Sequence, residues 1–143
     1  MTLKGRRILI IGGAGFIGHN LALNLINLNA KVSIIDGLEV NNITSVLGNS
    51  DNLPYPNLAY KVLNERIDLI RKMGINFYVQ DARNYHALSN LITKINPQVI
   101  IHLAAVSHAN RSNKDPYSTF DHSLRTLENV LDSSKNLKNL EIL

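Results

Sequence analysis

Cysteine is absent from this chain of 143 residues. The absence excludes a disulfide framework and any metal site built on thiolates. It also fits a reducing compartment, and we expect a cytoplasmic protein. Long apolar runs are missing as well, since no stretch approaches the roughly 20 residues that span a bilayer. The short run at 8–11 follows too few residues to belong to a signal peptide, so we expect no membrane association.

Charge of either sign is sparse and scattered. Lysine and arginine number 15 against 11 for aspartate and glutamate, which gives a net charge of +4, but no block of five or six like charges occurs. A nucleic-acid partner is therefore not indicated. With 45% hydrophobic and 18% charged residues, a chain of this length is typical of one globular domain with a sizeable core. We expect a single domain over residues 1–143.

Glycine is infrequent too, at eight residues, yet three glycines are evenly spaced at one place. Gly12, Gly15 and Gly18 follow the apolar run and precede a helical pattern of apolar residues. In such a strand–turn–helix unit, the first glycine permits a tight turn, the second lets the backbone approach a pyrophosphate, and the third lets the helix pack on the sheet. Free N–H groups at the helix start face the anion. The spacing therefore predicts a phosphate-binding turn.

A carboxylate completes this pattern. Asp36 follows the second apolar run, 32–35, and lies 18 residues after Gly18. In a dinucleotide-binding βαβ unit, an acid at this place accepts hydrogen bonds from the adenosine ribose hydroxyls. Its charge repels a 2′-phosphate, and the next two residues, Gly37 and Leu38, carry no cation. We therefore predict NAD rather than NADP as the cofactor. The alternative is a glycine-rich turn in an unrelated α/β protein.

Strands and helices alternate along the rest of the chain. The apolar spacing predicts strands near 6–11, 31–35, 75–79, 98–103 and 140–143, and helices near 15–29, 57–73, 84–95 and from 115 onward. Residues 37–56 are rich in Asn, Ser, Gly and Pro, and we expect them to be irregular. With right-handed crossovers, this order gives an α/β, Rossmann-type doubly wound parallel sheet with strand order 3-2-1-4-5.

Two of the helices carry further expectations. The helix at 57–73 is expected to cover the sheet, with Arg66 among the charged residues of its outer face, and no chemistry is assigned to it. The last helix is expected to start with Asp115 as its cap and Pro116 at its first position. A stripe of four apolar residues is expected to bury this helix, and it consists of Phe120, Leu124, Leu127 and Leu131.

The order of the strands predicts where a ligand binds. In an open parallel sheet, the ligand lies outside the carboxyl ends of the strands where the order reverses, here between the first and fourth strands. The glycine turn and the small residues Ala104 and Ala105 both end there. Asp81, followed by Ala82 at the end of the third strand, is placed to accept the exocyclic amine of adenine. Equally, Asp81 serves as a turn or cap residue.

Four segments together resemble one family. They are Gly-Gly-Ala-Gly-Phe-Ile-Gly at 12–18, Asp36, Gln-Asp-Ala-Arg at 80–83 and Val-Ile-Ile-His-Leu-Ala-Ala at 99–105. Their order and intervals are similar to those of the extended short-chain dehydrogenase/reductase family, in particular its NAD-dependent nucleotide-sugar epimerases and dehydratases. The resemblance implies a bound NAD that takes a hydride from a sugar carbon of a nucleotide sugar. It also implies that Phe16 and Ile17 present N–H groups to the pyrophosphate, and that a cofactor cleft is lined by Leu103, Ala104, Ala105 and Ser107.

The chain departs from this family in three respects. Ile11 stands where the family usually has Thr, and Ser123, Thr126 and Leu127 replace part of an Asn-x-x-Gly-Thr motif. In the family, a catalytic Ser or Thr ends the fifth strand and a Tyr-x-x-x-Lys pair follows on the next helix, and the chain ends before either. We therefore expect a fold truncated at strand 5, which holds the cofactor but is not a complete enzyme.

Two alternative functions also fit the sequence. The chain could be a non-catalytic dinucleotide-binding module, or an interaction module. In the second case the apolar strand at 140–143 pairs with another chain, either as a homo-oligomer or with a complementing C-terminal polypeptide.

His102, His108 and His122 flank the expected cleft, but their spacing has no metal-site pattern, so no metal is predicted. The resemblance implies that Ser107, His108 and Arg111 reach a sugar or its diphosphate. Equally, Arg111 and Lys114 form a solvated approach to the helix cap.

Overall fold

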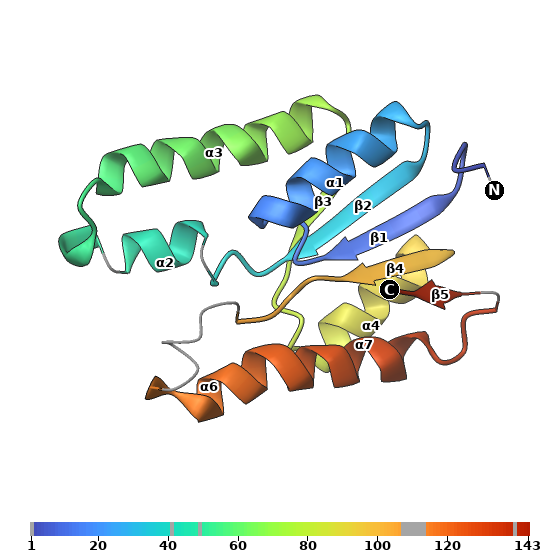
Figure 1. Ribbon diagram of the computed structural model, residues 1–143. Coiled ribbons are helices and arrows are strands. Elements are labelled where there is room, and N and C mark those ends of the chain that lie inside the picture. Colours follow the sequence, from blue (N-terminus) through green and yellow to red (C-terminus); the bar gives the residue numbers. More distant parts are fainter. Residues whose placement is uncertain (1, 41, 49, 107–113, 139) are drawn as a thin grey trace.

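The computed structural model describes residues 2–40, 42–48, 50–106, 114–138 and 140–143. Over these residues, five parallel strands form one sheet in the order β3-β2-β1-β4-β5, with helices on both faces (Figure 1). The strands are β1 (Arg7–Ile11), β2 (Lys31–Asp36), β3 (Asn76–Val79), β4 (Val99–His102) and β5 (Glu141–Ile142). The helices are α1 (Phe16–Asn27), α2 (Ile43–Leu47), α3 (Pro56–Lys72), α4 (Tyr85–Ile95), α6 (Pro116–Phe120) and α7 (Thr126–Ser134), together with a 3₁₀ turn η1 (Ser50–Asn52) and a π turn η2 (Asp121–Arg125). The predicted strand order and Rossmann-type arrangement are confirmed.

The sheet has a hydrophobic core on each face because side chains alternate along a strand. In β1, Ile8 and Ile10 belong to one core, whereas Leu9 and Ile11 belong to the other. Helices α1 and α3 cover the first face, and α4 and α7 cover the second (Figure 1). A central strand that is buried on both faces needs a continuous apolar sequence. This explains why residues 8–11 show no alternation of apolar and polar residues.

The expected helix starts are present. Asn84 accepts a hydrogen bond from the Ala87 N–H at 3.1 Å and so caps α4. Asp115 accepts one from the Ser118 N–H at 3.0 Å, with Pro116 in the first turn of α6. Each cap satisfies a backbone donor that the helix itself leaves free. Within the described ranges, no helix is both long and apolar enough to cross a membrane.

The segment expected to be irregular, 37–56, contains ordered elements. Asn42 starts the short helix α2 with a reciprocal capping box to Ser45, and η1 follows at Ser50–Asn52. The side chain of Asn42 is only 1% exposed, so the cap is buried and not on the surface. The composition of the segment concealed this helix because Asn and Ser favour helix caps as well as loops.

The predicted buried stripe of the last helix is wrong. Three of its four residues are exposed, namely Phe120, Leu124 and Leu131, and Leu127 is partly buried. The buried face instead consists of Thr126, Asn129, Val130 and Ser134. The buried face of α7 packs against α4 through Val130, and the expected apolar stripe lies on a different side of the helix.

The inward face of α7 is held by a polar contact. The Asn129 Nδ2 donates hydrogen bonds to the carbonyl oxygens of Ala82 and Arg83, each at 2.9 Å. Asn129 is buried, and its one side chain donates to both carbonyls. The contact ties α7 to the turn between β3 and α4, which also carries predicted site residues.

Replacing Asn129 tests this contact. We expect Asn129→Ala to lower the free energy of unfolding by about 2 kcal/mol, because a buried contact to the Ala82 carbonyl and a partly buried contact to the Arg83 carbonyl are both lost. Asn24→Ala is the matched control, since Asn24 is exposed and donates only along its own helix to the Asn20 carbonyl. Its effect should stay within about 0.5 kcal/mol. Urea unfolding followed by circular dichroism measures both, and equal losses would contradict the assignment.

Candidate functional site

A cleft of about 320 Å³ lies at the carboxyl ends of the strands. Ile11 of β1, Ile35 and Asp36 of β2, and Leu103 after β4 all line it. Its volume is at the lower end of the range for small-molecule sites, roughly 300–1,000 Å³. The cleft therefore occupies the reversal in strand order between β1 and β4, as predicted.

The predicted site residues converge on this cleft from separate parts of the chain. Eleven of the twelve line it, and they are Gly12, Gly15, Phe16, Ile17, Gly18, Asp36, Asp81, Ala82, Leu103, Ala104 and Ala105. Ser107 lies outside the described residues, as do His108 and Arg111. Nine further lining residues were not predicted as site residues, among them Glu39, Arg66, His122 and Thr126.

A side chain in the glycine turn would meet the closest contacts at Gly12 and Gly18 and a less close one at Gly15. A Cβ on Gly12, whose φ is +79°, would lie 2.7 Å from the Ala104 nitrogen, and one on Gly18 would lie 2.6 Å from the Gly13 Cα. These two glycines are therefore required by packing. A Cβ on Gly15 would meet only the Gly12 oxygen, at 3.2 Å. The backbone at Gly15, which precedes the first residue of α1, is thus open to a molecule in the cleft.

Asp36 fixes two turns at once. Its Oδ2 accepts a hydrogen bond from the Ala14 N–H at 2.9 Å, and its Oδ1 accepts one from the Leu38 N–H at 2.8 Å. Leu38 has a φ of +60°, which is unusual for a bulky side chain and typical of strained functional turns. Burial raises the pKa of Asp36, although the Leu38 and Ala14 hydrogen bonds and the Arg66 charge oppose it. Each carboxylate oxygen keeps a second lone pair for a ligand hydroxyl.

The peptide groups on both sides of Ala14 are held by side chains from three elements. Asp36 accepts from the Ala14 N–H, while the Ala14 carbonyl accepts from the Asn42 Nδ2 at 3.2 Å and the Arg66 Nη1 at 3.1 Å. Helix α3 therefore does more than cover the sheet, and the expected placement of Arg66 on its outer face is wrong. Capping chemistry at Asn42 could have been found from the Asn-x-x-Ser spacing. Nothing local indicates Arg66, because only tertiary packing brings α3 to the glycine turn.

Arg83 forms ion pairs with three carboxylates beside the cleft. Its guanidinium binds Asp81 through Nε and Nη2, Glu39 through Nη2 at 2.7 Å, and Asp121 through Nη1 at 3.1 Å. The bond to Asp81 raises the pKa of Arg83 further above its ordinary value. Burial alone would raise the pKa of Asp81, but the Arg83 hydrogen bonds and charge outweigh it and lower that pKa. This cluster connects the turn after β2, the turn after β3 and η2.

Asp81 combines the two roles that the sequence left open. Its carboxylate accepts the backbone N–H of Arg83 at 2.8 Å, and its carbonyl accepts the Asn84 N–H at 3.1 Å, as a turn residue does. It also lines the cleft beside Ala82. Because Arg83 already engages both carboxylate oxygens, only the remaining lone pairs are available to an adenine amine.

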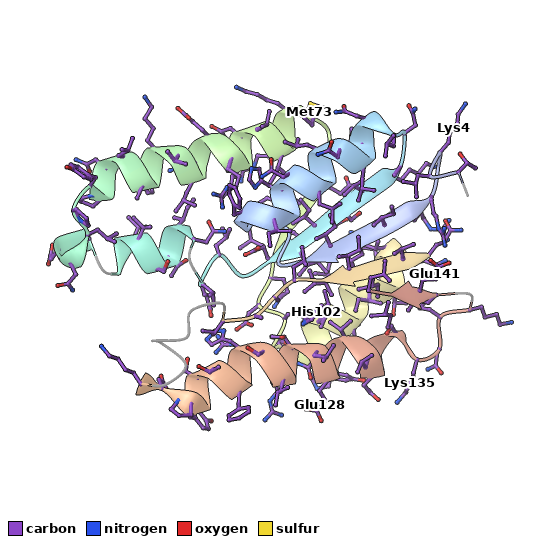
Figure 2. The ribbon with its side chains drawn as sticks, in the orientation of Figure 1. Lys4, Met73, His102, Glu128, Lys135 and Glu141 are labelled. Carbon is purple, nitrogen blue, oxygen red and sulfur yellow. The ribbon has the colours of Figure 1, made fainter. Side chains whose placement is uncertain are left out.

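The π turn shapes the wall opposite the glycine turn. It brings His122 to the cleft and is followed directly by Thr126, a buried lining residue. Figure 2 shows His102 at the end of β4, next to α7, and its Nε2 lies 3.4 Å from the Thr126 Oγ1. Burial lowers the pKa of His102, so the ring is neutral at pH 7. Among the described residues, no cluster of His, Asp or Glu could hold a metal ion.

The geometry of the cleft suits a molecule that carries both a phosphate and a sugar. The start of α1 offers backbone N–H groups and the positive end of a helix dipole, which favour a phosphate. The buried Asp36 carboxylate lies beside this turn and favours hydroxyl donors. Small residues at Ala104 and Ala105 leave the wall after β4 free of large side chains. A phosphate-linked sugar lying along the carboxyl ends of the strands satisfies all three features.

Similar sequences match nearly the whole chain. UDP-glucose 4-epimerase of Mycoplasma genitalium is 30% identical over 132 residues, which cover 92% of this chain and 33% of that protein. UDP-sulfoquinovose synthase of Sulfolobus acidocaldarius is 30% identical over 125 residues, which cover 86% and 30%. The chain thus spans about a third of the length of the curated relatives it matches.

Solved structures share the fold. UDP-glucose 4-epimerase of Thermus thermophilus, determined in complex with NAD, superimposes with a TM-score of 0.70 at 22% identity, and the match covers 95% of this chain and 36% of that one. UDP-glucose 4-epimerase of Stenotrophomonas maltophila, with NAD and formylated UDP-arabinopyranose bound, gives 0.72 at 23% identity, with coverage of 96% and 36%.

A model of one protein family accounts for most of the sequence. The match extends over residues 8–141 and therefore includes the glycine turn, Asp36, Asp81 and the segment after β4. The chain belongs to the NAD dependent epimerase/dehydratase family.

Proposed function

We propose that these 143 residues bind NAD and form the cofactor-binding part of a nucleotide-sugar epimerase or dehydratase. The observation that carries the proposal is the hydrogen bond from the Ala14 N–H to the Asp36 Oδ2, at 2.9 Å. This bond holds the glycine turn, proposed to bind the diphosphate, next to Asp36, proposed to bind the ribose. A dinucleotide needs both at once, whereas an unrelated glycine-rich turn needs neither the acid nor the contact.

Different residues of the cleft bind different parts of the cofactor. The N–H groups of Phe16 and Ile17, at the start of α1, hold the diphosphate. Asp36 accepts hydrogen bonds from the adenosine ribose, and Asp81 with Ala82 meets the adenine. The remaining half of the dinucleotide lies along Leu103, Ala104 and Ala105, and Ser107, two residues farther along the chain, is proposed to belong to the same wall. When bound, NAD supplies a hydride acceptor, and the residues named here bind and orient it.

Catalysis by the whole protein needs groups beyond this cleft. The family resemblance implies a Tyr-x-x-x-Lys pair as the proton acceptor for hydride transfer, and the 143 residues contain no such pair. Two tyrosines, Tyr85 and Tyr117, lie on α4 and α6 and are not followed by a lysine at that spacing. We therefore propose that the chain binds NAD without turnover, and that a nucleotide sugar is the substrate of the complete enzyme.

Pairing with another chain is proposed on the evidence of the sheet edge. Strand β5 pairs with β4 on one side, and Leu143 beside it is 73% exposed. An apolar edge of this kind favours association, either with a second copy or with a complementing polypeptide. Sizing by light scattering tests this, and a stable monomer at high concentration argues against it. The cytoplasmic location expected from the sequence stays a prediction.

Calorimetry with NAD tests the main proposal. We expect the 143-residue chain to bind NAD and ADP-ribose, and Asp36→Ala to weaken both by at least about tenfold, because a charge-assisted hydrogen bond to the ribose is lost. Asp68→Ala removes the same charge from the exposed side of α3 and serves as the matched control. Its affinity for NAD should equal that of the unaltered chain. Absence of any NAD uptake by folded protein would end the proposal.

The raised pKa of the partly buried Asp36 predicts a pH dependence of stability. Because this pKa is higher in the folded state, the folded chain binds the proton more tightly than the unfolded chain does, and the resulting stability is lost as pH rises through the folded pKa. Compared with Asp36→Asn, the unaltered chain should therefore gain relative stability when the pH is lowered from about 7 toward about 4. Urea unfolding of both proteins at the two pH values measures this difference. A relative loss on acidification would show that the folded protein favours the charged form.

A further inference from the structure

Arg66 brings a positive charge to the cleft from an unexpected direction. It projects from the middle of α3, and its Nη1 donates to the Ala14 carbonyl at 3.1 Å. Its side chain lines the cleft together with Asp36, Gly37 and Val40. These are the residues at and after the end of β2, where the sequence itself places no cation.

The charge of Arg66 is not matched by an ion pair in the described part of the protein. No carboxylate oxygen there lies within 4.0 Å of its guanidinium, although Asp36 is close enough to influence it. Burial lowers the pKa of Arg66, and the Asp36 charge only partly offsets this. Arg83 differs, because three carboxylates neutralise it, and it is not among the lining residues. Arg66 is therefore a partly desolvated cation that still has hydrogen-bond donors to offer.

Asp36 and Arg66 hold opposite sides of the same residue. Asp36 accepts the Ala14 N–H and Arg66 donates to the Ala14 carbonyl, so the two side chains converge on one peptide segment. If Asp36 binds the adenosine ribose, as proposed above, then a group on the 2′-oxygen lies between a carboxylate and a guanidinium. The carboxylate repels a 2′-phosphate there, and the guanidinium attracts it.

We propose that Arg66 is a second determinant of coenzyme choice, a latent contact for the 2′-phosphate of NADP beside Asp36. The proposal rests on the NAD site proposed above. In the unaltered chain the Asp36 charge outweighs Arg66 and keeps the cleft selective for NAD. When the charge of Asp36 is removed, the same cleft prefers NADP, because the cation is already in place. Glu39 also lines the cleft, but Arg83 engages its carboxylate at 2.7 Å and reduces its repulsion.

Paired substitutions at the two residues test the proposal. Calorimetric affinities for NAD and NADP are measured on the 143-residue chain, on Asp36→Asn, and on Asp36→Asn combined with Arg66→Gln. We expect the affinity for NADP relative to NAD to rise by about tenfold or more in Asp36→Asn, which corresponds to one charge-assisted hydrogen bond. The added Arg66→Gln should remove that gain. Higher salt should also reduce the gain, because it rests on charge.

Two controls separate the proposal from a general effect of charge or folding. Arg71→Gln, combined with Asp36→Asn, removes a cation from the exposed side of the same helix, where the Arg71 side chain is 62% exposed, and it should leave the NADP gain intact. Arg66→Lys, also combined with Asp36→Asn, retains the positive charge and should retain part of the gain in NADP affinity. Circular dichroism checks that each variant is folded. If NAD binds but Asp36→Asn gains no NADP affinity, or gains it equally without Arg66, the role of Arg66 is refuted. If neither nucleotide binds any folded variant, the NAD site itself is refuted.

Discussion

The site depends on one hydrogen bond, from the Ala14 N–H to the carboxylate of Asp36. This contact joins the turn after β1 to the end of β2, two places that are far apart in the chain and adjacent in the sheet. It uses a partly buried carboxylate, whose pKa is raised by burial. The same carboxylate also accepts the Leu38 N–H, and Leu38 has a positive φ. An ionisable group in a cleft with a shifted pKa is typical of a residue retained for a ligand.

The surrounding contacts keep this arrangement rigid. Asn42 and Arg66 fix the Ala14 carbonyl, while Arg83 links the turns after β2 and β3 to η2. These side chains come from separate parts of the chain, since Asn42 caps α2, Arg66 lies on α3 and Arg83 lies in the turn between β3 and α4. Helix α7 contributes through Asn129 and Thr126, so its inward face is largely polar where an apolar stripe was expected.

Membership of the NAD dependent epimerase/dehydratase family and the geometry of the cleft support the same role. The cleft brings together the glycine turn, the Asp36 carboxylate and a wall of small residues. The proposed role of Arg66 adds a feature that neither the fold nor the family match specifies. Under that proposal, coenzyme choice is a balance between the opposite charges of Asp36 and Arg66 and not the effect of one acid.

The sequence by itself determined the alternation of strands and helices, the strand order, and the meeting of the glycine turn with Asp36, because these follow from apolar periodicity and from spacing within one βαβ unit. Nearly all the predicted lining residues belong to such local patterns. Tertiary structure alone decided the roles of Arg66, Arg83 and Asn129, since each of them depends on a contact with a residue 38 or more positions away in the chain. Tertiary structure also decided that Leu124 and Leu131 are exposed, because α7 packs on α4 through the side that carries Val130.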